Sequence, residues 1–574
     1  MRRYYAGSVS ITGSDYISTK WRAQVQRRAG AAALPGPSGP SSPGVPAGRR
    51  PWPVWAVPFA VTLGVLLARN AFLFSVPEYE RADMGANSIL IEQARRFTLL
   101  VGNYSRKGFN HPGPAFLYVE SWGEDLFWAA LRAVPTAWNG QLIAVYALNA
   151  LFAASVVAVG YGWTRSARGA LAAGAAVACL AAVHPPVFSS DWMPYVYVLP
   201  FLAFLVSLAS VAAGQWRDGW IAALSGWFLV HGHAAFLFIV PAMVAVPAAV
   251  RLARAARAGR AADAGDGDGV RVQRRRRAWW PAAVISAVFA LPMLLEVAVN
   301  GDGNFARYFA YGSSASAGGH SAAAVSRFVL WFWWPAAGAW PGVSAWVVPL
   351  TAFLAAGLLT GRLAAGPVRV FCRWLLLIDA LAVAVVTGYA ATGVDVITDY
   401  YIGYFSWATP AVVLLVAALA AAELLSGASA RAALAAAAAA ALAACAVFAA
   451  VPATRTSTTD VDPLNPRAGQ PTDPLLRQVV AQLGVLAAGR VIVLTFPHDG
   501  WSDVTGILAQ AGRTGVRACV ASPGWAFMMS AASVCSRASL ENGYRMSVYP
   551  DNQIPPGARP AARLQRAIVT SGTK

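Results

Sequence analysis

The stretch YSRKGFNHPGPAFLY, residues 104–118, is a polar and turn-rich segment in a chain dominated by apolar runs. It contains two cations, Arg106 and Lys107, and His111 opens its rigid His-Pro-Gly-Pro sequence. A carboxylate, Asp83, precedes it. Cations of this kind can bind an anionic group, and a carboxylate can accept a proton. Which chemistry is possible depends on the elements that position these side chains and on the side of a membrane that they face.

The composition predicts a polytopic α-helical membrane protein. Of the 574 residues, 57% are hydrophobic and only 12% are charged, and the mean hydropathy is +0.50. A soluble protein carries roughly twice that charged fraction. Several windows of about 18 to 25 residues contain no charge, as a membrane-spanning helix requires. The net charge of +19 does not indicate nucleic-acid binding, because the arginines cluster in short gaps between apolar runs, as in cytoplasmic loops.

The apolar runs predict about eleven spans within residues 51–452. Residues 1–50 are basic and rich in Pro, Gly and Ser, so we expect a disordered cytoplasmic N-terminus. Every inner gap then carries arginine, most densely in the basic cytoplasmic loop 251–277. The rule that positive loops stay inside therefore predicts a cytoplasmic N-terminus and an extracytoplasmic C-terminus. The expected spans are 52–74, 141–163, 169–183, 195–214, 219–230, 234–250, 278–299, 343–359, 371–391, 402–425 and 432–451.

Residues 453–574 have the character of a small extracytoplasmic α/β domain. The run 489–496 reads as a buried strand, a helix is expected from Ser502 to about Gly512–Gly515, and 516–522 reads as a second strand. Cys519 and Cys535 lie in this polar region. They can pair if the region lies in an oxidising compartment, where disulfides persist.

The first outer loop, residues 75–139, should contain two helices that lie in the membrane interface. Residues 84–100 have helical spacing, with Asp83 at their start. The run 115–134 is apolar but interrupted by acidic residues. The apolar face of the first helix is expected to consist of Met84, Leu90, Ile91, Ala94 and Phe97, and the acidic residues of the second are Glu120, Glu124 and Asp125. A second outer loop is expected at 300–326.

This layout resembles the first outer loop of the GT-C glycosyltransferases. Protein O-mannosyltransferases and lipid A aminoarabinose transferases have D-E-x-x and H/K-P-P-L-G motifs where this chain has ADMGANS and NHPGPAFLY. The sequences DWMPYVYVLPF, GWFLVHGHAAF and LPMLLEVAVNGDGNFARYF also resemble uncharacterised actinobacterial members of this superfamily. The resemblance covers most of residues 50–450. It is a similarity of layout more than of sequence.

The resemblance implies transfer of a sugar from a polyprenyl-phosphate donor to a glycan or lipid acceptor of the cell envelope, at the outer face of a bacterial plasma membrane. An inverting transfer needs one carboxylate as base, and Asp83 occupies that position. Its alternative role is to cap the helix, and Glu78 and Glu80 are nearby alternatives for the base. The anionic leaving group needs cations or donors. Where many relatives have a second acid, this chain has Met84, so neither a divalent metal nor another cofactor is expected. The candidate phosphate ligands are Arg106, Lys107, Arg307 and Arg327.

Further polar residues in the outer segments are candidates for binding the donor or the acceptor. His111 can bind substrate or merely stabilise its turn. The spacing of His231 and His233 is found in metal sites, but no further ligands are recognisable nearby, which favours hydrogen bonding to the substrate or the loop. Asp395 and Asp399 lie close to tyrosines. The full set of substrate-binding candidates is Glu80, Tyr104, Asn110, His111, His231, His233, Glu296, Asn304, Asp399 and Tyr400.

Two other classes of function remain open. A lipid or glycolipid transporter or flippase would show inverted repeats and polar residues at the membrane midplane. The sequence has no convincing pair of halves, although Asp379 and Glu423 lie within apolar runs. The third possibility is a non-catalytic envelope-assembly protein that binds a partner through its C-terminal domain.

Overall fold

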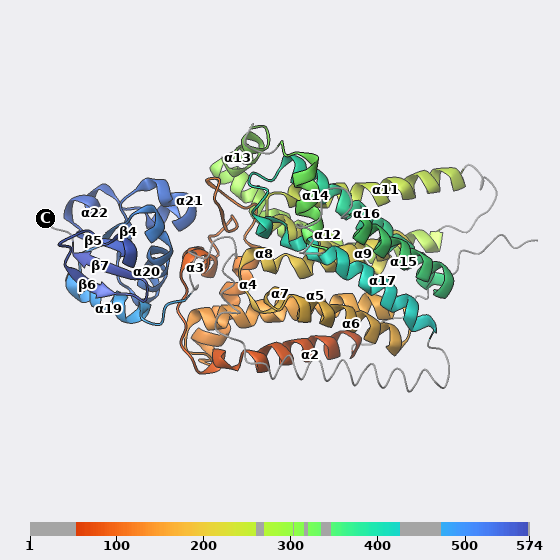
Figure 1. Ribbon diagram of the computed structural model, residues 1–574, viewed down its shortest axis with the longest axis horizontal. Coiled ribbons are helices and arrows are strands. Elements are labelled where there is room, and N and C mark those ends of the chain that lie inside the picture. Colours follow the sequence, from red (N-terminus) through yellow and green to blue (C-terminus); the bar gives the residue numbers. More distant parts are fainter. Residues whose placement is uncertain are drawn as a thin grey trace, which may run out of the picture. The chain divides into compact units, whose positions relative to one another are not determined.

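The computed structural model describes residues 53–259, 269–301, 303–314, 319–333, 346–364, 366–424 and 472–571 (Figure 1). The expected N-terminal segment 1–50 and the expected eleventh span, 432–451, lie outside these residues. Each of the other ten expected spans coincides with a helix. These helices are α2 (Pro53–Arg69), α5 (Ala137–Thr164), α6 (Ala167–Val183), α9 (Val198–Ala213), α10 (Gly219–Gly232), α11 (Phe236–Gly259), α12 (Gly269–Asn300), α15 (Val347–Leu363), α16 (Gly366–Thr392) and α17 (Ala408–Leu424).

Within the described part of the chain, six helical segments are long and apolar enough to cross a membrane. Most of α5 is buried, because α2, α4 (Ala115–Gly123), α6 and α9 pack around a helix that is apolar on all sides. By contrast, only 22% and 17% of the most apolar windows of α11 and α12 are buried. Their apolar side chains lie on the surface, which suits contact with lipid. The six segments are Ala137–Thr164, Met193–Ala213, Phe236–Ala253, Trp279–Asn300, Gly366–Thr392 and Tyr400–Glu423.

The expected first loop forms α3 (Ala82–Arg95), a hairpin of β1 (Tyr104–Ser105) and β2 (Phe109–Asn110), α4, and a π-helical turn η2 (Glu124–Ala130). Four residues of the predicted apolar face are buried, but Phe97 is 74% exposed and was wrongly assigned to that face. The helix ends at Arg95 because Phe97 adopts φ +56°, and the N–H groups of Phe97 and Thr98 bond back to Ala94 and Gln93. This is the Schellman arrangement of a helix end.

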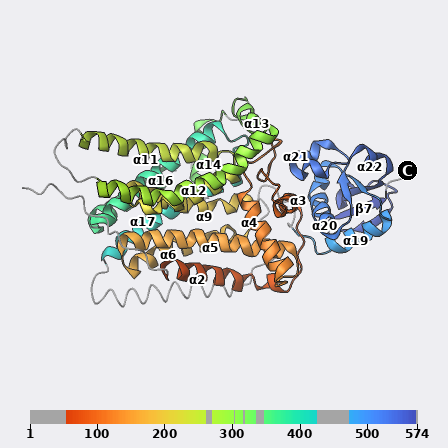
Figure 2. The same ribbon diagram turned by 180° about the vertical axis from the view of Figure 1, so that it is seen from behind.

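Helix α3 has contacts on two sides, and its expected position in the membrane interface stays a prediction. It packs against α4 on the membrane part and against α20 (Trp501–Thr514) of the C-terminal domain (Figures 1 and 2). Its buried residues therefore include small and polar ones, Gly85, Asn87 and Ser88, as well as the apolar ones. The helix is a connection between the two parts of the protein.

The C-terminal part is an α/β domain with a mixed five-stranded sheet of order β4-β3-β5-β7-β6. Strand β3 pairs in parallel with β4 and β5, and β7 is antiparallel to β5 and β6. The expected strand, helix and second strand correspond to β3, α20 and β4. The last three strands were not recognised in the sequence. The strands are β3 (Ile492–Thr495), β4 (Ala518–Val520), β5 (Tyr544–Pro550), β6 (Pro560–Arg563) and β7 (Ala567–Ser571), and α19 (Leu476–Ala487) precedes them.

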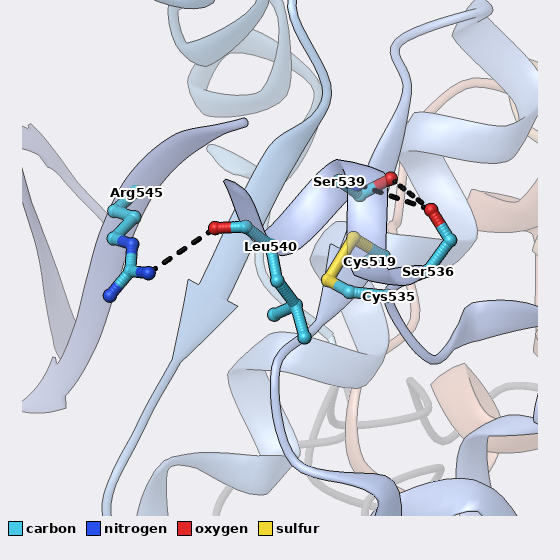
Figure 3. The surroundings of a disulfide bond; sticks show 6 residues. All are labelled: Cys519, Cys535, Ser536, Ser539, Leu540 and Arg545. Atoms are coloured by element: carbon cyan, nitrogen blue, oxygen red, sulfur yellow. Dashed lines mark hydrogen bonds between the residues drawn. A yellow bond between two sulfur atoms is a disulfide. The ribbon is translucent and has the colours of Figure 1, made fainter. Parts of the chain in front are cut away.

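A disulfide joins Cys519 of β4 to Cys535, with a Cα–Cα distance of 5.0 Å (Figure 3). These are the two cysteines that the sequence singled out. Cys535 precedes the short helix α22 (Arg537–Asn542), at whose start the hydroxyls of Ser536 and Ser539 lie 2.9 Å apart. The bridge therefore links the edge of the sheet to the segment that leads into β5.

Candidate active site

A cavity of about 790 Å³ lies where α3, the β1–β2 hairpin and the helix bundle meet. One part of its wall is polar and aromatic and includes Asp83, Tyr104 and His111. Another part is apolar and is formed by Phe238, Ile239 and Ala242 of α11 and Val385 of α16. Because both helices contain candidate membrane spans, the cavity connects a polar region to one that can lie within a bilayer.

Asp83 lies in the first turn of α3 and is half-buried. The hydroxyl of Tyr104 donates a hydrogen bond to its Oδ1, and Trp192 Nε1 donates to its Oδ2 at 2.7 Å. The N-cap position belongs to Arg81, which makes no side-chain cap hydrogen bond. Asp83 therefore does not act as the N-cap residue of α3. Instead, two donors from distant segments hold its carboxylate in one orientation at the cavity wall.

Tyr104 remains a neutral donor to this carboxylate. Burial raises the pKa of Tyr104 well above its ordinary value of about 10, and the neighbouring charge of Asp83 raises it further. The phenol therefore keeps its proton throughout the physiological range. Its ring also contacts Phe527 of the C-terminal domain, with the centroids 6.1 Å apart.

Arg106 and Lys107 line the cavity, but both are ion-paired. Arg106 bonds to Asp399 and, at 2.7 Å, to Asp395, and Lys107 Nζ lies 2.7 Å from Asp395 Oδ2. Burial alone would lower the pKa of Arg106, but the hydrogen bonds to Asp399 and Asp395 outweigh it and raise the pKa. Burial alone would raise the pKa of Asp395, but the hydrogen bonds from Lys107 and Arg106 outweigh burial and lower this pKa to about 2. The four groups thus form a charged cluster whose formal charges cancel.

The other two candidate phosphate ligands lie elsewhere. Arg307 is exposed on α13 (Gly303–Gly312), and its Nη1 donates to the carbonyl of Gly108 at 3.0 Å. Arg327 is exposed on α14 (Ala322–Trp331). Neither residue lines the cavity, whereas Tyr308 and Tyr311 of α13 do. Helix α13 therefore contributes aromatic rather than cationic groups.

Two histidines stack against each other in the cavity wall. The rings of His111 and His233 lie 4.6 Å apart and 29° from parallel. The Nδ1 atoms accept hydrogen bonds from the backbone N–H groups of Ala234 and Ala235, respectively, both at 3.2 Å. Burial lowers the pKa of both rings, to about 4 for His233, and the proximity of His233 lowers that of His111 further. The rings are thus neutral near pH 7, and because Nδ1 accepts, the proton is on Nε2.

His231 has a structural position outside the cavity wall. Its Nδ1 accepts from the N–H of Ala115 at 3.3 Å, and its Nε2 donates to the carbonyl of Phe289 at 2.8 Å. Gly113 lies so close that an added Cβ would be 2.3 Å from the imidazole. His231 therefore holds the Pro-Gly-Pro turn that the sequence placed before α4.

The remaining sequence candidates do not line the cavity. Glu80 is buried in an ion pair with Arg513, and the hydroxyl of Tyr308 donates to the carbonyl of Asn110 at 2.5 Å. Asp399 contributes indirectly through Arg106. The candidates outside the cavity wall are Glu80, Asn110, His231, Glu296, Asn304, Asp399 and Tyr400, whereas Tyr104, His111 and His233 line it.

Several wall residues were not proposed from the sequence. Trp192 follows the aspartate of the motif DWMPYVYVLPF, which carries part of the resemblance. This motif was the available signal for Trp192. No local signal pointed to Trp501, which reaches the cavity from α20 of a different domain. Aromatic wall residues that were missed include Trp192, Tyr197, Tyr308, Tyr311, Tyr389 and Trp501.

In the part of the chain that the structure describes, no three His, Cys, Asp or Glu side chains come together in a group that could hold a metal ion. The expectation that the protein works without a metal stays a prediction.

Comparison with solved structures identifies the fold. The structure of ArnT from Cupriavidus metallidurans in the apo state is similar, with a TM-score of 0.51 and 12% sequence identity over 91% of this chain and 99% of that chain. The fold of this chain is therefore similar to that of ArnT. No protein-family model matches the sequence, and no curated protein matches it.

Proposed function

We propose that this protein is a membrane glycosyltransferase that moves a sugar from a polyprenyl-phosphate donor to a cell-envelope acceptor. The observation that carries the proposal is the position of Asp83, which lies in the polar part of a cavity whose other wall is apolar and built from two candidate membrane helices. A lipid-linked sugar has the same division into a polar head and an apolar chain. The GT-C-like fold supports the same class of reaction.

The apolar wall suits the prenyl chain of the donor. Phe238, Ile239 and Ala242 of α11 and Val385 of α16 all line the cavity. A branched hydrocarbon chain that binds there exchanges its contacts with water or lipid for contacts with apolar side chains. This exchange has little cost in solvation. The donor phosphate and sugar then reach the polar wall around Asp83.

The reaction would begin when Asp83 removes the proton from an acceptor hydroxyl. Each carboxylate oxygen accepts one hydrogen bond, from Tyr104 or Trp192, and each retains a lone pair for the substrate. The acceptor oxygen attacks the anomeric carbon from the side opposite the phosphate, so the configuration inverts. The bond between the sugar and the phosphate oxygen breaks, polyprenyl phosphate leaves with the electron pair, and the proton stays on Asp83.

Donors in the cavity wall would stabilise the leaving phosphate. Arg106 and Lys107 are the cations there, and a phosphate can bind them by sharing or displacing the carboxylates of Asp395 and Asp399. His111 and His233 add neutral Nε2–H donors, because their Nδ1 atoms are used by the backbone. No divalent metal is proposed.

We place this site at the outer face of a bacterial plasma membrane. The arginine-rich gaps lie at the opposite ends of the expected spans from the Asp83 loop. The disulfide between Cys519 and Cys535 supports the same orientation, because disulfides persist in oxidising compartments. The α/β domain would then be extracytoplasmic.

The test is a transfer assay with the purified full-length protein, a panel of radiolabelled polyprenyl-phosphate sugars and a crude envelope fraction as acceptor. Asp83→Asn should lower kcat by at least 100-fold. Asp125→Asn, in the same loop but paired with Arg95 outside the cavity, should retain wild-type activity. Wild-type rates in Asp83→Asn would remove the base assignment. If the wild-type protein transferred none of the sugars but moved the lipid between leaflets of a vesicle, the flippase alternative would replace this proposal.

A further inference from the structure

The residue before Asp83 has an unfavourable backbone conformation that the C-terminal domain holds in place. Ala82 has φ +53°, in the left-handed region that costs a residue with a Cβ roughly 1 kcal/mol or more. Its carbonyl accepts a hydrogen bond from Thr505 Oγ1 at 3.0 Å. Thr505 belongs to α20, 423 positions along the chain. The direction in which α3 begins, and with it the position of Asp83, therefore depends on a contact from another domain.

Buried ion pairs to the same helix hold the two residues before Ala82. Arg81 Nη2 lies 3.2 Å from Asp503 Oδ1, with 5% and 4% of the two side chains exposed. Glu80 pairs with Arg513 near the other end of α20, and both are almost fully buried. Removing one partner of a buried pair leaves an uncompensated charge, so such pairs hold their geometry strictly.

The two helices cross closely enough that both need glycine at the contact. A Cβ at Gly85 would lie 2.8 Å from Thr505 Oγ1 and 3.0 Å from the backbone nitrogen of Gly506. A Cβ at Gly506 would lie 2.8 Å from the carbonyl of Glu80. The approach of α20 to the first turn of α3 is therefore direct, backbone against backbone.

The side chain of Asp83 makes its hydrogen bonds in the other part of the protein. They come from Tyr104 and Trp192. Trp501, the first residue of α20, lines the same cavity. One helix of the C-terminal domain thus supports the backbone that leads to Asp83 and also forms part of the wall that Asp83 faces.

We propose that the C-terminal domain is a working part of the active site, and that Thr505 is a positioning residue that aligns Asp83 by holding Ala82 in its left-handed conformation. This inference rests on the proposed role of Asp83 as base. A separable binding module or partner-binding domain would behave differently. In that case the contacts of residues 80–82 would not affect the chemical step.

The first test compares two valine substitutions on the same helix. Thr505→Val removes the hydroxyl that reaches Ala82 and keeps the side chain's shape. Thr514→Val is the matched control, because the Thr514 hydroxyl donates to carbonyls of its own helix, those of Gln510 and Ala511. We expect Thr505→Val to lower kcat at least tenfold with the donor KM changed less than twofold, and Thr514→Val to change neither by more than twofold. A rise in KM without a fall in kcat would overturn the positioning role.

A second test asks whether Thr505 acts through Ala82. Glycine adopts φ +53° without strain, so Ala82→Gly removes the need for the support. In the Ala82→Gly background, Thr505→Val should lower kcat less than threefold. An undiminished loss in that background would show that Thr505 acts by another route. If Thr505→Val does not fold, Thr505→Ser and Thr505→Ala, which differ only in the hydroxyl, replace it, and only the alanine variant should lose kcat.

Amide hydrogen exchange separates this inference from the proposed function. In the full-length protein, exchange of the amides in residues 83–88 should be faster in Thr505→Val than in Thr514→Val, whether or not a sugar substrate is found. Failure of the wild-type protein to transfer any sugar, with this difference present, would reject the proposed reaction and keep the structural coupling. Equal exchange in the two variants would overturn the coupling itself.

Discussion

The indole nitrogen of Trp192 donates a 2.7 Å hydrogen bond to Asp83 across 109 positions of the chain. It connects the start of α3 to the segment just before α8 (Met193–Val196). Because hydrogen bonds to charged groups contribute about 1.5–3 kcal/mol, this contact is strong enough to select one orientation of the carboxylate.

Trp192→Phe keeps the aromatic surface of the cavity wall and removes this donor. We expect kcat in the transfer assay to fall about tenfold or more, because the carboxylate would lose one of the two bonds that orient it. Trp122→Phe is the control, since Trp122 is 57% exposed on α4 and does not line the cavity. An unchanged kcat in Trp192→Phe would contradict the orienting role.

Arg106→Ala should weaken binding of the donor. The substitution removes a cation from the cavity wall and leaves two carboxylates, Asp395 and Asp399, with one cation, Lys107, so the cluster becomes negative and repels a phosphate. We expect the donor KM to rise at least tenfold. The double variant Arg106→Ala/Asp395→Asn should recover part of that loss, because with Lys107 and Asp399 remaining the formal charges of the cluster cancel again. A double variant no better than the single one would argue against a phosphate at this position.

The stability of the protein should fall as the pH is lowered from about 6.5 to about 4, in part because of His184. Its ring stacks on Trp407 at 4.0 Å, and burial lowers its pKa to about 4. Between that value and the unfolded pKa of about 6.5, the unfolded state binds more protons, so the free energy of unfolding decreases with decreasing pH.

The measurement is thermal unfolding of the detergent-solubilised protein at pH 7 and pH 4.5. The fall in Tm between the two should be smaller in His184→Asn than in the wild type. An equal fall in both proteins would show that His184 does not titrate in this way.

Gly113→Ala should destabilise the Pro-Gly-Pro turn. An added Cβ would lie 2.3 Å from Nδ1 of His231, so the imidazole or the turn must move. Overpacking of this kind costs about 1–3 kcal/mol, which should appear as a lower Tm and reduced transfer activity. Gly174→Ala on α6 is the control, because its Cβ would meet only Val157, at 4.0 Å. Equal Tm values for the two variants would contradict the tight contact.

Local sequence patterns were sufficient for much of the fold. Spans are set by runs of apolar residues, and every expected span within the described residues coincides with a helix. The buried positions Met84, Leu90, Ile91 and Ala94 followed from helical spacing, whereas Phe97 did not, because the left-handed turn that excludes it from the helix depends on backbone hydrogen bonds rather than on side-chain periodicity. The strand–helix–strand unit before Ser522 was also recognisable.

The site was only partly predictable. Asp83, Tyr104 and His111 could be named because they lie in the expected first outer loop, residues 75–139. Arg307 and Arg327 were named for a similar reason, yet they do not line the cavity. Charge and predicted membrane side indicate which residues can bind an anion. Charge and predicted membrane side do not indicate the direction in which a helix points the side chains of those residues.

The sequence by itself determined which helices are apolar enough to span a membrane, and it pointed to the loop that carries Asp83. Both depend on hydropathy and turn chemistry, which act over neighbouring residues. Only the tertiary structure decided that Arg106 pairs with Asp399, 293 positions away, and that Thr505 supports Ala82. Such contacts join segments whose distance in space depends on how the whole chain packs, and no local pattern carries that information.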